Sequence, residues 1–349
     1  MRKLVTLRTV SKLSPIEGAD VIEVATVDGW ECVVKKGEFQ EGDWGIYFEI
    51  DSMIPHKDWC DHLFKNQKDI DRGFLRIKSI RLRGQLSQGL MLPLPLLLDT
   101  DLTEAIGVYK YEPPVPEDMS AKSRFPSFIS KTDEERIQNL IDKLPEYSKK
   151  LVYKTEKLEG SSITLHCVRN EDGIGWDYGV SSRNLELKLF TEMKDLDSLV
   201  DDFKVIQIPT ENKFVSTARK MDLPTKMISW CLEHDKDLVL QGELIGTSIQ
   251  DNIYNLKEKT IRFFTAQDGK NKRLNYDEFI EIINELELET VPVLGVNESL
   301  SDDFDFLLKD ADGRSELHDT AREGVVYRAM DGSFSFKVVS NKYLLKSGR

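Results

Sequence analysis

The sequence predicts an α+β protein of two domains. Residues 1 to about 110 read as short strands separated by turns rich in Gly, Asp and Pro. The remainder mixes strand-like runs with segments of helical periodicity. Such a mixture is typical of antiparallel sheets with flanking helices. A chain of 349 residues with 40% hydrophobic residues is also long enough to bury two cores.

The N-terminal region is expected to form a small β-barrel of the OB type. Its runs alternate apolar and polar residues and are separated by turns such as Asp28-Gly29 and Lys36-Gly37. Several short strands at this spacing are typical of a small barrel, and OB barrels commonly bind oligonucleotides on one face. The expected strands include Val21–Val27, Trp30–Lys35, Trp44–Ile50, Phe74–Ile80 and Leu90–Leu92.

A basic run in this region predicts a nucleic-acid contact surface. The net charge of −13 argues against a protein that coats nucleic acid indiscriminately. Residues 72–83, however, hold basic residues and no acid, which favours phosphate contacts over the alternative of a solvated face. We assign these contacts to Arg76, Lys78, Arg81 and Arg83.

A proline-rich segment separates the two predicted domains. Pro113-Pro114-Val115-Pro116 predicts a stiff linker. We therefore expect domains at residues 1–112 and 123–349, with the linker at 113–122. There is no apolar run near 20 residues, so no membrane-spanning helix is expected. Four cysteines without a CxxC pair favour reduced thiols in the cytoplasm.

Helices and strands alternate in the second predicted domain. A helix is expected between Thr132 and Pro145, because Thr132 and Glu135 form a capping-box pair and the apolar residues that follow repeat helically. Further helices are expected at residues 213–234 and 276–288, the second begun by Asn275. The expected strands are residues 151–190, Leu238–Leu240, Gly324–Ala329 and Phe334–Val339.

The most informative residue of the chain is Lys157, in the run Lys154-Thr155-Glu156-Lys157-Leu158-Glu159-Gly160. A surface lysine has a pKa of about 10.4, so a nucleophilic lysine needs a nearby cation or desolvation. Glu159 can hold a hydrated metal ion beside the amine, and Gly160 allows a phosphate or ribose to approach the backbone. Alone, a run of this kind also occurs in solvated turns.

Further motifs follow Lys157 in a fixed order. Glu243 stands between two glycines in an apolar strand, where a charge is expected only if it has a function. An aromatic strand with Phe263 and Phe264 comes next. The motifs are Ser182-Arg183-Asn184, Leu240–Gly246, Arg322–Arg328 and Ser335–Tyr343.

With these motifs, residues 123–349 resemble the covalent nucleotidyltransferases, which include ATP-dependent DNA and RNA ligases and mRNA capping enzymes. Thr155-Glu156-Lys157 with Gly160, Ser182-Arg183-Asn184 and the long motif from Phe336 to Tyr343 are similar to the RNA ligase version. The resemblance is closest to nick-sealing RNA ligases that carry an OB-like domain before the ligase domain. It implies a nucleotidyltransferase domain whose antiparallel sheets wall an ATP cleft.

The resemblance also implies roles for individual residues. Lys157 would attack the α-phosphate of ATP, and Lys337 would contact that phosphate. Glu159 and Glu323 would hold Mg²⁺ or Mn²⁺, and Glu243 would join them or bind the ribose. The alternative for Glu243 is a surface carboxylate on an edge strand, without a role at the site.

Other residues would bind the nucleotide without reacting. Glu156 would contact it, and Arg183 would bind a phosphate or ribose. One of Phe263 and Phe264 would stack on adenine while the other packs in the core. Many relatives have Lys-x-Lys in the last motif, whereas this chain has Lys337-Val338-Val339, so the second cationic role falls to Lys342 or is absent.

We therefore expect an ATP-dependent RNA ligase that joins 3′-hydroxyl and 5′-phosphate ends, at nicks in duplexes, through lysyl-AMP and polynucleotide-adenylate intermediates. Its partners would be RNA or an RNA-containing nicked duplex, and it would act as a monomer. The alternatives are a DNA ligase, an mRNA-capping guanylyltransferase or a non-catalytic RNA-binding protein on the same fold.

Overall fold

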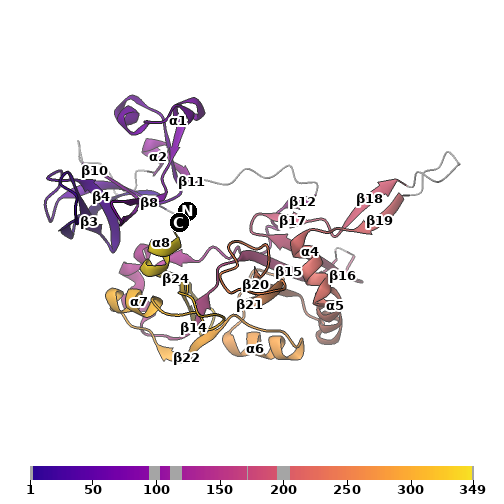
Figure 1. The fold of residues 1–349 in the computed structure, drawn as a ribbon. Helices are drawn as coiled ribbons and strands as arrows, with labels where there is room; N and C mark the ends of the chain where they lie inside the picture. Colours follow the sequence, from indigo (N-terminus) through magenta and orange to yellow (C-terminus); the bar gives the residue numbers. More distant parts are fainter. Residues whose placement is uncertain (1–2, 94–102, 111–119, 171, 195–204, 348–349) are drawn as a thin grey trace. The chain divides into compact units, whose positions relative to one another are not determined.

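The computed structural model describes residues 3–93, 103–110, 120–170, 172–194 and 205–347. Contacts within the chain divide it into two units (Figure 1). The N-terminal unit contains Met1–Pro114 together with Asn341–Arg349, and the second unit contains Val115–Ser340. The predicted domain boundaries stay a prediction, and residues 113–119 of the predicted linker lie outside the described residues.

The N-terminal unit is built from small antiparallel sheets. The described strands pair in the orders β1-β5-β10, β2-β3-β4, β11-β6-β7 and β8-β9, not as one closed barrel. Trp30 and Tyr47 stack in one of its two apolar cores, with ring centroids 6.0 Å apart. Its elements are β1 (Val5–Thr9), β2 (Lys12–Pro15), β3 (Ile22–Val27), β4 (Trp30–Lys35), β5 (Trp44–Phe48), β6 (Ser52–Pro55), η1 (Asp58–Leu63), α1 (Gln67–Arg72), β7 (Phe74–Arg76), β8 (Ser79–Leu82), β9 (Gln85–Gln88), β10 (Leu90–Pro93), α2 (Thr103–Ile106), β11 (Tyr109–Lys110) and α8 (Asn341–Ser347).

The single strand predicted over Phe74–Ile80 is wrong, because two different partners divide it. β7 pairs with β6, whereas β8 pairs with β9. A two-residue turn at Arg83-Gly84 joins β8 to β9, and both residues have positive φ, 51° and 83°. Such a turn matches the twist of the two strands it connects. The basic run is therefore split between two separate strand pairs.

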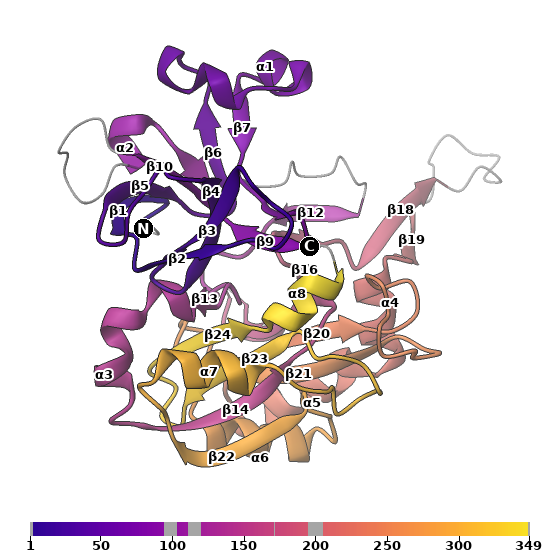
Figure 2. The same cartoon turned by 60° about the vertical axis from the view of Figure 1, so that its left-hand side comes forward.

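The second unit consists of two larger sheets with helices around them (Figures 1 and 2). One sheet has the order β12-β17-β16-β15-β20-β21 and the other β13-β24-β23-β14-β22. β13 runs parallel to β24, and the hairpin β18-β19 projects from the unit in both views. The elements are β12 (Ala121–Arg124), β13 (Glu135–Arg136), η2 (Ile137–Asn139), η3 (Ile141–Lys143), α3 (Leu144–Tyr147), β14 (Leu151–Lys157), β15 (Ser161–Arg169), β16 (Trp176–Ser182), β17 (Leu185–Leu187), β18 (Phe190–Lys194), β19 (Val205–Pro209), α4 (Lys213–Lys220), α5 (Leu223–His234), β20 (Leu238–Ile245), β21 (Thr260–Gln267), α6 (Tyr276–Glu285), β22 (Val293–Ser299), α7 (Phe304–Ala311), β23 (Gly324–Ala329) and β24 (Ser335–Val339).

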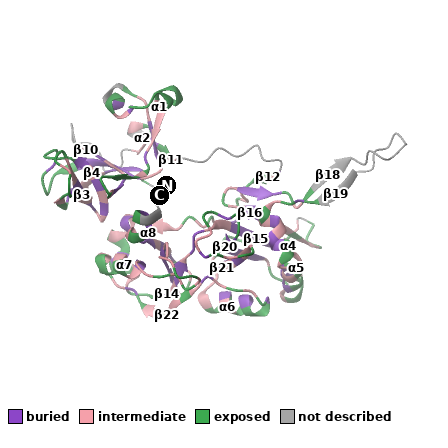
Figure 3. Ribbon diagram, viewed as in Figure 1, coloured by how far each residue is buried: buried purple, intermediate pink, exposed green. Residues whose placement is uncertain are grey.

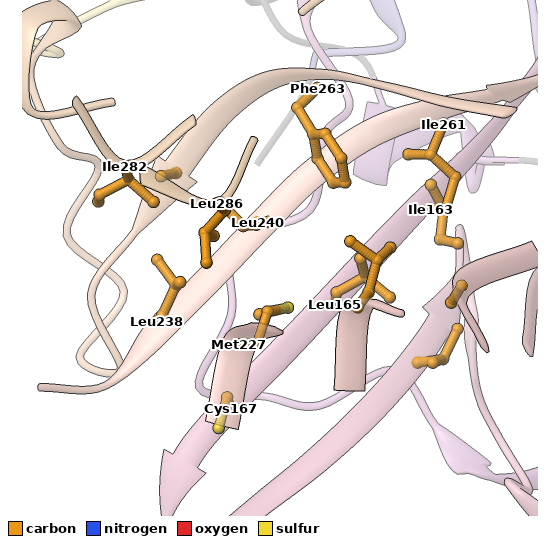
Figure 4. Close-up of a cluster of buried hydrophobic side chains, with 14 of the residues drawn as sticks. Ile163, Leu165, Cys167, Met227, Leu238, Leu240, Ile261, Phe263, Ile282 and Leu286 are labelled. Carbon is orange, nitrogen blue, oxygen red and sulfur yellow. The ribbon is translucent and has the colours of Figure 1, made fainter. Parts of the chain in front are cut away.

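Helices cover one face of the six-stranded sheet. Ile163 and Leu165 of β15 and Phe263 of β21 pack with Met227 of α5 and Ile282 of α6 (Figure 4). Successive strand residues point to opposite faces, so the polar residues that alternate with these face away from the helices. Figure 3 shows the buried positions concentrated in the strands and the exposed ones on the helices. The sheet thus keeps one face for an apolar core and the other for polar side chains.

The five-stranded sheet has its own core beneath α7. Val152, Val325 and Phe336 of the strands pack with Leu307 of α7. Tyr147 stacks on Phe334 with ring centroids 4.0 Å apart. Each sheet is therefore stabilised by a separate apolar cluster. No helix among the residues described here is long and apolar enough to cross a membrane.

The helix predicted between Thr132 and Pro145 is wrong. Glu135 and Arg136 instead pair with β24 as a short parallel strand, and 3₁₀ turns follow. Pro145 stands in the first turn of the short helix α3, so it begins a helix instead of ending one. Pairing with a distant strand outweighed the local periodicity, and the apolar residues still reach the core at Ile137 and Leu144.

The other predicted helices are present. α6 begins at Asn275, whose side chain accepts from the backbone N–H of Glu278 while Glu278 caps Asn275 in return. The segment 213–234 forms two helices, α4 and α5, because Asp222 adopts φ of 55° and Pro224 begins a new helix.

Candidate active site

Strand register brings Lys157 and Glu323 together. Lys157 is the last residue of β14 and pairs with Gly324, the first residue of β23. The lysine Nζ therefore lies 2.5 Å from the Oε1 of Glu323. Both side chains are partly buried, with 24% and 19% of their surfaces exposed. An amine and a carboxylate from segments far apart in sequence thus meet at the ends of two neighbouring strands.

Glu243 lies beside this pair because β20 packs against the turn after Lys157. A Cβ on Gly160 would stand 2.7 Å from the Cγ of Glu243 and 2.5 Å from the carbonyl oxygen of Leu244. The pKa of the Glu243 carboxyl is raised to about 8, chiefly by burial and also by the repulsion of Glu323, while the attraction of Lys157 opposes the shift. Glu243 is thus a half-buried acid on an interior strand of the sheet, not an exposed residue on an edge strand.

Close packing within the protein requires glycine at several positions of these motifs, which the sequence did not indicate. A Cβ at Gly242 would meet the carbonyl oxygen of Arg262 at 2.7 Å, and one at Gly246 would meet that of Glu258 at 2.1 Å. The close neighbours belong to β20 at Gly160, to β21 at Gly242 and to Glu258 and Lys259, just before β21, at Gly246. The inference that these glycines admit a ligand is not needed to explain them.

Glu159 is buried in the turn that follows the nucleophile candidate. Its backbone N–H donates to the hydroxyl of Tyr254 at 2.6 Å. Tyr254 belongs to an apolar cluster with Leu158 and Phe264. This hydrogen bond fixes the turn, and with it the direction of Lys157.

Lys337 is a half-buried cation on β24. Its pKa is lowered to about 7, chiefly by burial and also by the positive charges of Lys157, Arg136 and Arg183, while Asp133 opposes the shift. Arg136 pairs with Lys337 through the parallel register of β13. The negative charge near Lys337 is therefore too small to keep its pKa at the usual value for a lysine.

Arg183 stands in the turn after β16, where its side chain is 59% exposed. Its Nη2 lies 2.6 Å from the Oδ1 of Asp133. Arg183 is also close enough to Glu243 to favour that carboxyl's charged form. The structure thus brings Arg183 to the same site as Lys157, Glu243 and Lys337.

The two phenylalanines of β21 point into different environments. Phe263 is fully buried in the core beneath the helices (Figure 4). Phe264 packs instead with Leu158, next to the nucleophile candidate, and lies 5.0 Å from the guanidinium of Arg328. Of the two, Phe264 is therefore the one near the site.

Glu156 is buried beside the same apolar cluster. Its Oε2 accepts from the backbone N–H of Glu316 at 2.9 Å, while its Oε1 is buried without a hydrogen-bond partner among the described residues. Burial raises the pKa of this carboxyl. A buried acceptor without a donor is costly and marks a place for a polar ligand group.

The remaining predicted residues belong to the N-terminal unit. Arg76 forms an ion pair with Asp51, at 2.6 Å from Nη2 to Oδ1. Lys78, Arg81 and Arg83 are exposed, as is Lys342 on α8. These five residues are not part of the cluster around Lys157 described above, and their roles stay predictions.

Comparisons with known proteins decide the family. A sequence model described as RNA ligase matches residues 150–344, and one described as an OB-fold domain matches residues 4–94. The chain belongs to the RNA ligase family. It is an α+β ligase with an N-terminal OB-fold domain, which confirms the predicted fold class.

This RNA ligase is similar to solved structures of Naegleria gruberi RNA ligase over the whole chain. A mutant of that enzyme with AMP and Mn is 36% identical, with 100% of each chain covered and a TM-score of 0.78. A mutant with ATP and Mn is 35% identical, with 99% of each chain covered and a TM-score of 0.77. The enzyme with PPi is 37% identical, with 99% of each chain covered and a TM-score of 0.76. Comparison with curated proteins yields no match.

The sequence interpretation of this ligase missed Asp133, Arg136 and Tyr254. Asp133 and Arg136 lay inside the segment mistaken for a helix, where they read as ordinary surface charges. Tyr254 lies in a segment without strand or helix periodicity.

The charges of the ligase site fit a divalent cation and phosphates. The described residues contain no preformed group of three His, Cys, Asp or Glu side chains able to hold a metal ion. A cation would therefore keep several waters, as Mg²⁺ commonly does. Opposite charges nearby do not fully offset the burial of Glu243 beside Glu323 or of Lys337 among its neighbouring cations. A metal ion with phosphates would supply opposite charge to both.

Proposed function

We propose that this RNA ligase uses ATP to join RNA 3′-hydroxyl and 5′-phosphate ends at nicks in duplexes. The observation that carries the proposal is the amine of Lys157, 2.5 Å from Glu323 and next to the half-buried Glu243. ATP, AMP and PPi in the names of the similar Naegleria gruberi structures support the nucleotide and the leaving group. A non-catalytic role is disfavoured, because these charged groups are costly to bury without a ligand.

Lys157 is the nucleophile of the first step. The neutral amine attacks the α-phosphate of ATP, an N–P bond forms, and the P–O bond to pyrophosphate breaks. Lys337 and Arg183 neutralise phosphate oxygens during this displacement, in which positioning and charge carry most of the catalysis. AMP then passes to the 5′-phosphate of RNA, and the 3′-hydroxyl displaces it.

Glu323, Glu243 and Glu159 are the residues that would hold Mg²⁺ or Mn²⁺. Glu323 contacts Lys157 directly, so a cation at this carboxylate changes the charge around the amine. When bound, the cation favours the neutral lysine and neutralises phosphate charge. Glu159, buried in the turn next to Lys157, is suited to contact through water.

Adenine is the base that suits the apolar cluster of Phe264 and Leu158. The Oε1 of Glu156 is a buried acceptor that needs a donor, and the exocyclic amine of adenine supplies one. Guanine has a carbonyl oxygen at that position, which would face the carboxylate unfavourably. Phe264 rather than Phe263 is the residue available to stack on the base. These features favour ATP over GTP, and so a ligase over a capping enzyme.

RNA is the proposed partner of the N-terminal unit. The phosphate contacts would come from Arg76, Lys78, Arg81 and Arg83. The contribution of Arg76 would be the smaller one, because it already pairs with Asp51. Lys342 remains the candidate for the second cation of the last motif. We further propose that the ligase is a monomer. It would work in the cytoplasm, because its four cysteines are free thiols.

The substrate is tested with nicked duplexes that differ only in the sugar at the 3′-hydroxyl end. A ribose at this position should be sealed much faster than a deoxyribose, and single-stranded ends should be sealed poorly. Equal sealing of both sugars would favour the DNA ligase alternative. Sealing of single strands as fast as nicks would contradict the nick preference.

A further inference from the structure

The segment Phe125–Asp133 crosses the polar face of the six-stranded sheet. The carbonyl oxygen of Ser130 accepts from the side-chain amide of Gln241 at 2.7 Å. The hydroxyl of Thr132 hydrogen-bonds that of Ser162 at 2.7 Å. Both partners lie on strands of the sheet that carries Glu243, so this segment is fixed on the site side of the sheet.

The chain leaves this sheet at Asp133 and joins the other one. Arg136, three residues on, pairs with Lys337 of β24. Asp133 thus lies where the two sheets are bridged, with its Oδ1 2.6 Å from Arg183 of the six-stranded sheet. Its charge also acts on Lys337 of the five-stranded sheet. One carboxylate therefore faces cations from both sheets.

The cations around Asp133 repel one another when no phosphate is bound. Lys157, Arg136 and Arg183 all act on Lys337 in the sense expected of like charges. A carboxylate in their midst reduces this repulsion. The pair between Asp133 and Arg183 is partly exposed, at 35% and 59%, and exposed ion pairs are weak. A phosphate with more charge and more acceptor oxygens can replace it.

We propose that Asp133 is a positioning residue that stands in for a nucleotide phosphate, holding Arg183 at the site until incoming phosphates displace the carboxylate. The role rests on the proposed function, because it requires that Arg183 bind phosphate. It follows that Asp133 competes with phosphates for Arg183. Removal of its negative charge should therefore strengthen phosphate binding.

The test uses the full-length enzyme and inorganic pyrophosphate as the probe, with affinity measured by calorimetry in the absence of metal. Asp133→Asn should bind pyrophosphate about twofold to fivefold more tightly than wild type, the range expected for an exposed ion pair. The gain should shrink when Arg183→Gln is already present, leaving only the effect of the Asp133 charge on Lys337. Asp142→Asn, the same charge change at an exposed position on η3, should leave the affinity unchanged.

Unchanged or weaker pyrophosphate binding by Asp133→Asn would overturn the proposal, as would an equal gain in the Arg183→Gln background. Asp133→Ser, which also lacks the charge, provides a second variant with the same expectation if the first folds poorly. Self-adenylylation of the wild type, measured in parallel, tests the proposed function separately. If the wild type adenylylates itself and Asp133→Asn binds pyrophosphate no more tightly, only the role of Asp133 is lost.

Discussion

A half-buried lysine among other cations holds its proton poorly until an anion arrives. Lys337 is in this position, with a pKa lowered to about 7 by burial and by the neighbouring positive charges. At pH 8 most of the free enzyme would therefore carry a neutral Lys337. Phosphates beside it raise the pKa again, so their binding is linked to uptake of a proton.

We predict that ATP binding at pH 8 takes up as much as about one proton. Affinity should consequently fall as pH rises above 7, and the uptake should vanish below pH 6, where Lys337 is already charged. Calorimetry in two buffers of different ionisation enthalpy measures the uptake, with metal omitted so that carboxylates release no protons. Lys337→Met should reduce the uptake, with any remainder assigned to Glu243, whose pKa is raised to about 8. Identical heats in both buffers for the wild type would show that no proton is taken up, which would contradict a neutral Lys337 in the free enzyme.

The charge of Glu323 next to Lys157 should matter for the rate of lysyl-AMP formation and little for the stability of the fold. Glu323→Gln should slow lysyl-AMP formation by about 10²- to 10³-fold, the usual effect of removing one preorganised electrostatic group. Stability should change little, because the side chain stands at a strand end and is partly exposed. Single-turnover assays over a series of Mn²⁺ concentrations measure the rate. Undiminished adenylylation at saturating metal would remove Glu323 from the metal site.

At the scale of elements, the site depends on how closely β20 approaches the turn between β14 and β15. Gly160→Ala places a methyl group 2.5 Å from the Leu244 carbonyl oxygen, so one element must move. We expect the free energy of unfolding to fall by about 1–3 kcal/mol, as for other overpacked sites. Adenylylation should fall further, because Glu243 is displaced with β20.

Urea denaturation and adenylylation rates of Gly160→Ala measure the two effects together. Gly173→Asn is the matched control, since its Cβ meets nothing within 4 Å and Asn tolerates the φ of 73° at that position. A variant of Gly160 that is as stable and as active as the wild type would show that β20 and the turn are free to separate.

Elements whose local signals agree with their tertiary partners were predictable from sequence. The Asn275 cap and its helix, and the strand Trp30–Lys35, need no information from elsewhere in the chain. The segment 132–145 carries an equally clear helical pattern, yet β24, about 200 residues away, pairs with Glu135 and Arg136 as a short strand, and 3₁₀ turns follow. A distant pairing of this kind leaves no local signal.

The active site follows the same rule. Lys157 and Glu323 were predicted to belong to one site because a sequence motif marks each, and the two side chains lie 2.5 Å apart. Asp133 was not predicted, since its importance comes only from contact with Arg183 of another sheet. The choice between Phe263 and Phe264 also required the packing, because both lie on one strand with similar flanks.

At the scale of the molecule, the two units divide the proposed work between ATP chemistry and RNA binding. We predict that the full-length variant with Lys78→Gln, Arg81→Gln and Arg83→Asn binds nicked duplex more weakly. Its dependence on salt should flatten by about one unit of slope per lost contact. Asn is chosen at position 83 because φ there is positive, at 51°. Lysyl-AMP formation should be unchanged, because the candidate site lies in the second unit.

Arg76→Gln provides the comparison within the basic run. Its guanidinium is held by Asp51, so this change alone should alter the salt slope less than each exposed residue does. If the triple variant binds nicked duplex like wild type across a salt series, the run is only a solvated face.

The most direct test of the whole proposal is a covalent bond between AMP and Lys157. Incubated with α-phosphate-labelled nucleotide and Mg²⁺ or Mn²⁺, the wild type should acquire label from ATP and not from GTP, at a site that peptide mapping assigns to Lys157. Lys157→Ala and Lys157→Arg should acquire none, because arginine keeps the charge but is not deprotonated. Lys157→Ala should still seal a nick that is already adenylylated. Label on Lys157→Ala, or transfer from GTP instead of ATP, would contradict the assignment of the nucleophile and of the nucleotide.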